Sequence, residues 1–480
     1  MKIILVNPPY INFEGMKESG GHAMPFNLAY LAGYLRAKID CEIKILDTEA
    51  MALGYEEIKN FLAKEKPDIV GFTCLSPTIN HVLEICRIIK EDLELLNCVT
   101  VLGGTHPTIL PQEVMSNPYV DFAVIGEGEE TFYELVKTLS DKKTDFEKIN
   151  GLYFKRRGEI INNPPRQMIQ NLDDIPFPAR DLFDLKLYYS APTKKLTEEQ
   201  CSPLQTSRGC NFDCVHCVSK SIWQRRLRYR SADNVIAEIE ECINKFNIKE
   251  FNILDDNFTL NRPRAFEICQ KIIDKKLPIA WICSSRADTI SDELAEIMAK
   301  AGCKKISFGL ESGSQKVLSL MRKQTTTEIG KRAISIARRH GILAHASFML
   351  GNIGETEETI RETIDFAKSL DLDNATFFIT CPVPGSDLYY YAQKEGLISK
   401  DTPWERFAPL SNTAPLPVQR SLTPADLVYW QKRAFREFYL RPKYIIRKLK
   451  QLNSWDGIKT VFLGMLILGR ILFKPKPKNK

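Results

Sequence analysis

The stretch CNFDCVHC at positions 210–217 decides how this sequence is interpreted. It carries three cysteines at positions i, i+4 and i+7, namely Cys210, Cys214 and Cys217. Three thiolates in one loop can hold three irons of a [4Fe–4S] cluster and leave the fourth iron open to another ligand. A structural zinc ion would need a fourth cysteine or histidine close by, and His216 inside the loop is badly placed to complete a tetrahedron. The pattern therefore favours an iron–sulfur cluster over zinc.

Around this loop, from 202 to 380, apolar runs alternate with amphipathic segments. We expect strands at Leu204–Thr206, Glu250–Leu254, Ile279–Ser284, Lys305–Gly309, His345–Leu350 and Ala375–Thr380, and helices at Ala232–Lys245, Arg264–Lys275, Asp292–Ala301, Thr327–His340 and Thr356–Leu370. Six β/α units in succession predict a partial barrel, and barrel enzymes place their chemistry at the C-terminal ends of the strands. The cysteine loop follows the first of these strands.

The first 150 residues predict a separate α/β domain. Strands are expected at Lys2–Asn7, Glu42–Asp47, Ile69–Thr73, Val99–Gly103 and Phe122–Gly126, with helices at Pro25–Lys38, Tyr55–Lys64, Ile79–Leu95 and Glu129–Ser140. This alternation indicates a doubly wound, Rossmann-like parallel sheet, in which ligands bind at the carboxyl ends of the strands. All five strands are followed by small or polar residues, which favours a binding edge, although glycine, proline and serine also simply make turns.

We therefore divide the chain into four segments by its composition and periodicity. Closely spaced prolines between 164 and 178 block regular structure and predict a linker. The segments are the sheet domain at 1–145, the linker at 146–200, the barrel at 201–385 and a helical C-terminal region at 386–480.

Charge is unevenly distributed along the sequence. The last 50 residues contain 14 lysines and arginines against 2 acidic residues, so the remainder of this chain of net charge +6 carries −6. A mildly acidic body gives no support to nucleic-acid binding. The 13 irregularly spaced cysteines and the lack of an export signal predict a reducing, cytoplasmic location. The basic tail with its apolar run Val461–Leu468 suits either an interfacial membrane anchor or a helix packed on the barrel.

The CxxxCxxC pattern after the first strand of a β/α barrel resembles the radical S-adenosylmethionine (SAM) superfamily. The resemblance implies that Cys210, Cys214 and Cys217 bind the cluster and that SAM chelates the remaining iron. It further implies that electron transfer from a donor such as ferredoxin or flavodoxin cleaves SAM to a 5′-deoxyadenosyl radical.

Further SAM contacts are implied by the ends of the later strands. Asp255 and Asp256 stand where the superfamily positions the SAM amino group, although the usual GGE triplet is replaced here by Asp-Asp-Asn. Arg286 would meet the SAM carboxylate, since a guanidinium pairs well with a carboxylate. Read without the resemblance, the two aspartates could cap a helix and Arg286 could form a surface ion pair. The segments expected near the ribose and adenine contain Glu311, Ser312 and Gly351.

A parallel sheet before such a barrel resembles the cobalamin-binding (B12-binding) subgroup. The resemblance implies that cobalamin inserts its nucleotide tail at the strand ends, beside Ser76, Thr78, Gly103, Gly104 and Gly126. The histidine of the DxHxxG motif is missing, because Asp47-Thr48-Glu49 stands in its place. His22 and His106 are interpreted as hydrogen-bonding loop residues rather than cobalt ligands.

The resemblance implies an anaerobic methyltransferase that uses methylcobalamin and a 5′-deoxyadenosyl radical to methylate an unactivated carbon. One alternative is an oxidative cyclase or carbon–carbon coupling enzyme with the same cofactors and no net methyl transfer. Another is a non-catalytic cobalamin-binding sensor. The basic, apolar C-terminus suggests a lipid-like small-molecule substrate, or peripheral contact with the inner face of the membrane.

Overall fold

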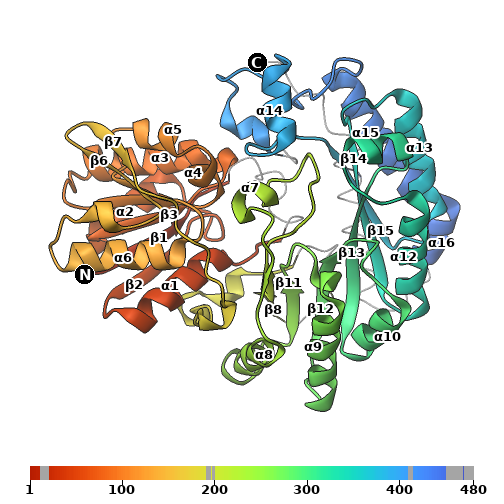
Figure 1. The fold of residues 1–480 in the computed structure, drawn as a ribbon, viewed down its shortest axis with the longest axis horizontal. Coiled ribbons are helices and arrows are strands. Elements are labelled where there is room, and N and C mark those ends of the chain that lie inside the picture. Colours follow the sequence, from red (N-terminus) through yellow and green to blue (C-terminus); the bar gives the residue numbers. More distant parts are fainter. Residues whose placement is uncertain (11–20, 191–195, 197–199, 409–413, 450–468, 470–480) are drawn as a thin grey trace. The chain divides into compact units, whose positions relative to one another are not determined.

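The computed structural model describes residues 1–10, 21–190, 196, 200–408, 414–449 and 469 of the 480-residue chain. It divides into two compact units (Figure 1). The first consists of Met1–Glu14, Met24–Tyr188 and Ser221–Trp223, and the second of Gly15–Ala23, Tyr189–Lys220 and Gln224–Lys480.

The first unit is built on a seven-stranded sheet of order β2-β1-β3-β4-β5-β6-β7. Its strands are β1 (Lys2–Asn7), β2 (Glu42–Asp47), β3 (Ile69–Thr73), β4 (Val99–Gly103), β5 (Phe122–Val124), β6 (Leu152–Arg156) and β7 (Glu159–Asn162). The first five are parallel, which confirms the doubly wound sheet. Because β1 lies between β2 and β3, the chain reverses its direction of winding between β1 and β3, where such sheets bind ligands.

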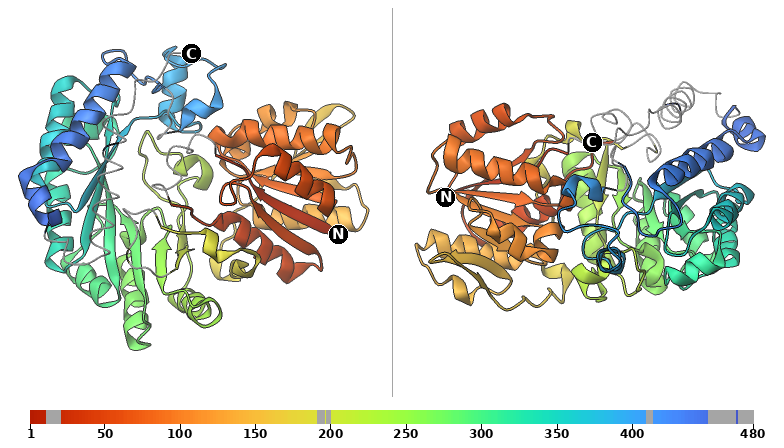
Figure 2. Two further views of the ribbon diagram at one scale, coloured as in Figure 1. Left: turned by 180° about the vertical axis from the view of Figure 1, so that it is seen from behind. Right: turned by 90° about the horizontal axis from the view of Figure 1, so that it is seen from above.

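Helices cover this sheet as its apolar periodicity predicts. They are α1 (Phe26–Lys38), α2 (Tyr55–Glu65), α3 (Ile79–Arg87), α4 (Thr105–Ile109), α5 (Pro111–Ser116) and α6 (Gly128–Ser140). Buried residues of α1 and α6, among them Leu35 and Phe132, share one core cluster with Leu5 of β1 (Figures 1 and 2). The single helix expected over Ile79–Leu95 is shorter, because a π-helical segment, Ile88–Asp92, follows α3.

The segment 146–200 differs from the expected linker. β6 and β7 form an antiparallel hairpin that extends the first sheet beyond β5. The turn between them contains Gly158 in the left-handed region, with φ of +85°. Two short apolar runs around a glycine are a hairpin signal, and the prolines begin only at Pro164, after the second strand. The first unit accordingly continues to Tyr188 rather than ending at 145.

The second unit contains a six-stranded parallel sheet of order β15-β14-β13-β12-β11-β8. Its strands are β8 (Cys201–Leu204), β11 (Glu250–Ile253), β12 (Ala280–Ser285), β13 (Cys303–Glu311), β14 (Leu343–Leu350) and β15 (Asn374–Ile379). Each strand is added beside the previous one in chain order, which confirms the partial barrel. A small antiparallel pair, β9 (Ser207–Arg208) and β10 (Arg228–Tyr229), flanks the cysteine loop.

Helices that follow the barrel strands lie outside the sheet (Figures 1 and 2). They are α8 (Ala232–Phe246), α9 (Arg262–Asp274), α10 (Asp292–Lys300), α12 (Thr327–Arg339), α13 (Glu357–Ser369) and α15 (Pro424–Tyr439). The remaining helices are α7 (Ser219–Trp223), α11 (Gln315–Leu320), α14 (Asp387–Lys394) and α16 (Pro442–Leu449). Phe435 and Phe438 of α15 contact Phe377 of β15, so α15 is part of this core. Among the described residues, no helix has the length and hydropathy needed to cross a membrane. The run Val461–Leu468 lies outside them.

Candidate active site

The cysteine loop lies between β9 and α7 and is held at its middle residue. The Val215 N–H donates to the carbonyl of Met321 over 3.1 Å, and the Val215 carbonyl accepts from the N–H of Leu388 over 2.9 Å. Val215 also packs in a buried cluster with Val317 and Met321. Backbone hydrogen bonds to two distant segments, one of them α14, therefore set the path of the loop.

A ring of charges ties the same loop to α14. Asp213 accepts from Arg322 over 2.7 Å and from Lys220 over 3.3 Å. Both of these cations also pair with Asp387 at the start of α14. The ring lies partly exposed, so it adds less to stability than to the geometry of the loop.

Backbone N–H groups of Phe212 and Ser219 donate to the thiols of Cys210 and Cys217, which suits sulfur ligands. Cys217 Sγ lies 3.4 Å from the N–H of Ser219, and the Cys217 N–H donates to the carbonyl of Cys214 over 3.1 Å. Burial raises the pKa of Cys217 to about 11 and also raises that of Cys210. Iron binding would remove these protons, because the thiolate is the ligand. Within the described residues, no three His, Cys, Asp or Glu side chains gather closely enough to hold a single metal ion.

Asp255 and Asp256, which the sequence assigns to one task, have different surroundings. Asp255 is buried and accepts four hydrogen bonds. Two come from the N–H and hydroxyl of Thr206 and two from those of Ser207, at 2.5–3.0 Å. Asp256 is exposed and accepts from the Ser219 hydroxyl over 2.8 Å. Asp255 therefore fixes the chain after β8, and Asp256 is the carboxylate that a ligand can reach.

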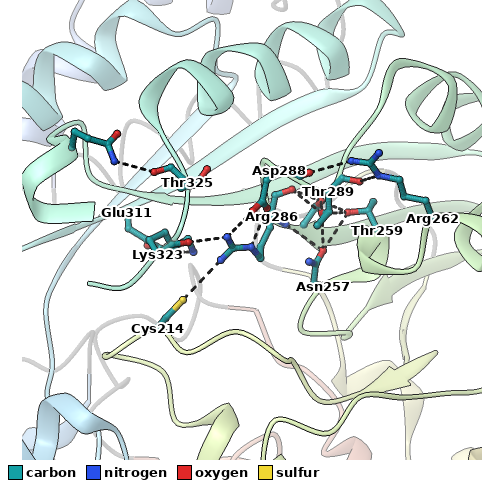
Figure 3. A network of polar contacts seen from close by, with 12 residues as sticks. Cys214, Asn257, Thr259, Arg262, Arg286, Asp288, Thr289, Glu311, Lys323 and Thr325 are labelled. Atoms are coloured by element: carbon teal, nitrogen blue, oxygen red, sulfur yellow. Dashed lines mark hydrogen bonds and ion pairs between the residues drawn. The ribbon is translucent and has the colours of Figure 1, made fainter. Parts of the chain in front are cut away.

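Asn257 is the centre of a small buried network. Its Oδ1 accepts from the Thr259 and Thr289 hydroxyls, each over 3.2 Å, and from the Arg286 N–H over 3.3 Å (Figure 3). Its Nδ2 is buried and meets no hydrogen-bond acceptor among the described residues. An unsatisfied buried amide is costly, and a bound ligand with an acceptor would satisfy it.

Arg286 is buried and directs its guanidinium into the protein (Figure 3). It forms a two-point pair with Asp288, at 3.0 and 2.7 Å, and donates to the Lys323 carbonyl over 2.8 Å. Its Cζ lies 3.5 Å from the centre of the Phe212 ring, and Nη1 lies 3.9 Å from Cys214 Sγ. The alternative of an ion pair therefore holds in part, because Arg286 pairs with Asp288, but the pair is not a surface one: the Arg286 side chain is buried and that of Asp288 is 24% exposed.

Glu311 and Lys323 form a second buried ion pair, 2.9 Å apart. Glu311 sits at an irregularity in the β13–β14 register with φ of +64°, the left-handed region that non-glycine residues rarely adopt. Burial favours a neutral Glu311, but the charge and hydrogen bond of Lys323, together with the nearby His216 and Arg286, outweigh burial and lower the pKa of the carboxyl. Nearby, burial lowers the pKa of His216 to about 4. Ser312 is buried and exchanges a 3.0 Å hydrogen bond with Thr363.

The loop after β14 is shaped by packing at Gly351. Gly351 has φ of +89°, and a Cβ there would lie 2.7 Å from Cδ2 of Leu427 in α15. Its N–H and that of Asn352 donate to Glu355 Oε2 over 2.5 and 2.9 Å. Glu355 is fully buried, and burial raises its pKa to about 7. In this structure Gly351 thus admits α15, and the contact of its segment with the ribose and adenine of SAM, which the resemblance implies, stays a prediction.

In the first unit, the loops after β3 and β4 are joined to each other. Ser76 is buried and lies 3.0 Å from His106 Nδ1 through its hydroxyl. Thr78 uses its hydroxyl locally, with the N–H and carbonyl of Leu75. His106 is fully buried, which lowers its pKa to about 4. His22 bonds to the backbone of Tyr189 and belongs to the second unit.

Glycines shape the ends of β4 and β5. At Gly104, with φ of +103°, a Cβ would lie 2.9 Å from the backbone of Cys74, so only glycine fits. Gly103 makes ordinary contacts, and Gly126, with φ of +78°, borders open space. The Thr108 hydroxyl donates to the Gly104 carbonyl over 2.7 Å and accepts from the Gly126 N–H over 3.0 Å. The predicted residues Ser76, Gly104 and Gly126 therefore lie on connected loops at one sheet edge.

Sequence reasoning missed several partners that decide these geometries. Asp47 is buried and accepts from Asn7 Nδ2 over 2.8 Å and from the Tyr188 hydroxyl over 2.9 Å. Asp288 was within reach of sequence analysis, because it stands two residues after Arg286. Lys323 and Tyr188 carried no local signal, since their partners are distant in sequence.

Two family models match the chain. The radical SAM superfamily matches residues 204–367, which include the cysteine loop and most of the barrel. The B12 binding domain matches residues 15–136, which include strands β2 to β5 of the first sheet.

Relatives align over most of the chain. An uncharacterized methyltransferase of Pyrococcus horikoshii is 36% identical over 97% of this chain and 98% of its own length. An anaerobic magnesium-protoporphyrin IX monomethyl ester cyclase of Rubrivivax gelatinosus is 31% identical over 81% of this chain and 69% of its own length.

Solved structures share the fold. The radical SAM methyltransferase TsrM from Kitasatospora setae, with cobalamin and a [4Fe–4S] cluster bound, superimposes with a TM-score of 0.66 at 20% identity, covering 91% of this chain and 81% of its own. The cobalamin-dependent SAM radical enzyme OxsB gives a TM-score of 0.72 at 18% identity, over 98% and 73%.

Proposed function

The chain belongs to the B12-binding branch of the radical SAM superfamily, and from this premise we propose how its residues carry out cobalamin-dependent methyl transfer. Its cofactors are a [4Fe–4S] cluster, SAM and cobalamin, which together supply one-electron reduction, a 5′-deoxyadenosyl radical and a methyl group for an unactivated carbon. The main support for the proposal is the position of the cysteine loop, which backbone hydrogen bonds of Val215 hold at the strand ends of a six-stranded partial barrel.

We assign the cluster to Cys210, Cys214 and Cys217. The Ser219 N–H and the Arg286 guanidinium, which point at two of these sulfurs, support the assignment, because donors to sulfur stabilise thiolate ligands. Asp256 is assigned to the SAM ammonium group, since it is the exposed carboxylate of the Asp255–Asp256 pair.

The remaining proposed contacts differ in how well their surroundings suit a ligand. Ser312 and Glu311 orient the ribose end of SAM indirectly, because both side chains already have buried partners. Cobalamin is assigned to the sheet edge lined by the loops of Ser76, Gly104 and Gly126, where Gly126 leaves open space.

The experiment is anaerobic reconstitution of the full chain with iron, sulfide and hydroxocobalamin, followed by SAM carrying a CD₃ group and dithionite. We expect retained corrin absorbance, 5′-deoxyadenosine and CD₃-cobalamin by mass spectrometry. The control variant Cys214→Ala should keep the corrin but form no 5′-deoxyadenosine. Wild-type protein that retains no corrin after desalting would contradict the proposal.

A cyclase without net methyl transfer is the second candidate, favoured by the 31% identity to the Rubrivivax cyclase. The same experiment separates the two. A cyclase would form 5′-deoxyadenosine but leave no CD₃ group on cobalamin, whereas a methyltransferase would form both. The sensor alternative predicts neither product.

The substrate is a small molecule, and we propose that it is lipid-like or is met at a membrane surface. Ile445 and Ile446 of α16 are 41% and 54% exposed beside the exposed Lys443, which supports contact with an anionic surface. Binding to vesicles with 30% phosphatidylserine should be lost when residues 455–480 are deleted and Ile445 and Ile446 are replaced by serine, and unchanged binding of that variant would refute the proposal. We further propose a low-potential ferredoxin or flavodoxin as electron donor, tested by replacing dithionite with each.

A further inference from the structure

We propose that Arg286 tunes the reduction potential of the iron–sulfur cluster through Cys214 and does not bind the carboxylate of SAM. The inference rests on the proposed function, because it takes Cys214 as a cluster ligand. It concerns a role that the residue type alone did not indicate, since an arginine at a strand end suggests a ligand carboxylate.

The binding edge of the guanidinium is already occupied. Arginine binds a carboxylate most strongly through two parallel N–H···O hydrogen bonds, and Nε together with Nη2 can donate such a pair. Both of these nitrogens donate to Asp288, over 3.0 and 2.7 Å, and Nη2 also donates to the Lys323 carbonyl over 2.8 Å (Figure 3). A SAM carboxylate would have to displace Asp288, a like-charged side chain that arrives from the same loop.

The remaining nitrogen, Nη1, points at the cysteine loop. It lies 3.9 Å from Cys214 Sγ, while the guanidinium lies over the ring of Phe212, with Cζ 3.5 Å from the ring centre. Because Phe212 and Cys214 belong to the same loop, the stacking holds the cation against the ligand sulfur. Arg286 is only 7% exposed, so water screens its charge weakly.

The sign of the effect follows from charge. Reduction adds one electron to the cluster, and a nearby cation together with N–H donation to a ligand sulfur stabilises the more negative state. Arg286 should therefore raise the potential and make the cluster easier to reduce. Asp288 partly offsets this effect, so its removal should raise the potential further.

The test is an anaerobic redox titration of the reconstituted full chain, followed by electron paramagnetic resonance of the reduced cluster. For Arg286→Gln we expect the ratio of reduced to oxidised cluster at a fixed potential to fall about tenfold, which corresponds to about 59 mV for a one-electron couple. For Asp288→Asn we expect a shift in the opposite direction. Opposite signs separate electrostatic tuning from general damage, which would move both variants alike.

Arg262→Gln is the matched control. Arg262 belongs to the same network, but it donates to the backbone carbonyls of Thr289 and Asp288, over 2.8 and 3.1 Å, and lies on the side away from Cys214 (Figure 3). Its replacement should change the ratio less than twofold. Equilibrium dialysis with [methyl-³H]SAM is measured alongside for all three variants, and Arg286→Gln should bind SAM within about threefold of wild type.

The following outcomes would overturn the inference about Arg286. If the cluster of Arg286→Gln had the same reduction potential as that of the wild type, and SAM bound about tenfold more weakly, Arg286 would be a ligand of the SAM carboxylate and the inference would be overturned. If Arg286→Gln assembles no cluster, the Asp288→Asn titration decides, and an unchanged or lowered potential there overturns it. Failure of the wild-type chain to assemble any cluster would overturn the proposed function and this inference together.

Discussion

Replacing the two neighbouring aspartates Asp255 and Asp256 one at a time should produce two different defects. The perturbation is the same in both cases, Asp→Asn, which removes one negative charge and preserves shape. The residues are adjacent and were assigned one role from sequence, yet Asp255 is buried with four donors and Asp256 is exposed with one. We expect Asp255→Asn to lower stability and Asp256→Asn to lower SAM affinity.

The magnitude follows from the hydrogen bonds. Each charge-assisted bond contributes about 1.5–3 kcal/mol and a neutral bond about 1 kcal/mol. Neutralising an acceptor of four bonds therefore costs on the order of 3 kcal/mol, partly because the new NH₂ must face the hydroxyls of Thr206 and Ser207. For a domain of about 150–250 residues, each kcal/mol lost from the free energy of unfolding lowers Tm by about 2–4 °C, so we expect the Tm of Asp255→Asn to fall by roughly 6–12 °C.

The assay pairs a melting curve with a binding curve. Thermal unfolding is followed by circular dichroism under anaerobic conditions, and SAM binding by equilibrium dialysis of the reconstituted protein. Asp256→Asn should melt within about 2 °C of wild type, since an exposed substitution costs little. It should bind SAM roughly tenfold or more weakly, because one charged hydrogen bond is lost.

The reverse pattern would refute this reasoning. If Asp255→Asn melted like wild type and lost SAM affinity, its carboxylate would be a ligand group and the four hydrogen bonds would be incidental. Equal melting points for the two variants would show that burial at Asp255 does not control its energetic role.

Three further predictions follow from buried groups. Gly351→Ala should lower the free energy of unfolding, measured by chemical denaturation, by about 2–4 kcal/mol, because the alanine would have a positive φ and would clash with α15. The control Gly341→Ala has φ of +72° but no atom within 4 Å of the new Cβ, so it should lower that free energy by only about 1–2 kcal/mol. Equal losses in the two variants would show that packing against α15 contributes nothing. Glu355 has a pKa raised from 4.5 to about 7, so the folded state holds a proton that the unfolded state has lost, and stability falls as pH rises through this window. The free energy of unfolding of the wild-type chain should therefore fall by roughly 3 kcal/mol across the window. Denaturation curves of Glu355→Gln at the same pH values should not show this fall. Lys323→Met should lower stability by about 3–5 kcal/mol, because it leaves Glu311 buried and unpaired, and the double variant with Glu311→Gln should recover much of that loss.

The fold was largely predictable because its signals are local. Apolar runs such as those of β1 and β14 alternate with amphipathic helices at a spacing that is typical of parallel β/α units. The hairpin of β6 and β7 was missed because the prolines that follow it dominated the interpretation of 146–200. Edge strands that extend a sheet have short, weak patterns, and their pairing with β5 depends on contacts that sequence does not display.

The sequence by itself determined the chemistry that this protein can host: three thiols at cluster spacing, charged residues after the barrel strands, and small residues after the strands of the first sheet. Only the tertiary structure decided which of the charged groups remain available. Asp255 is buried and bonded to Thr206, which is distant in sequence, and Arg286 is buried and paired with Asp288 of its own loop. Asp256 is exposed. The physical reason is that a residue type specifies charge and hydrogen-bonding capacity, while burial and the partners brought together by folding determine where that capacity is used.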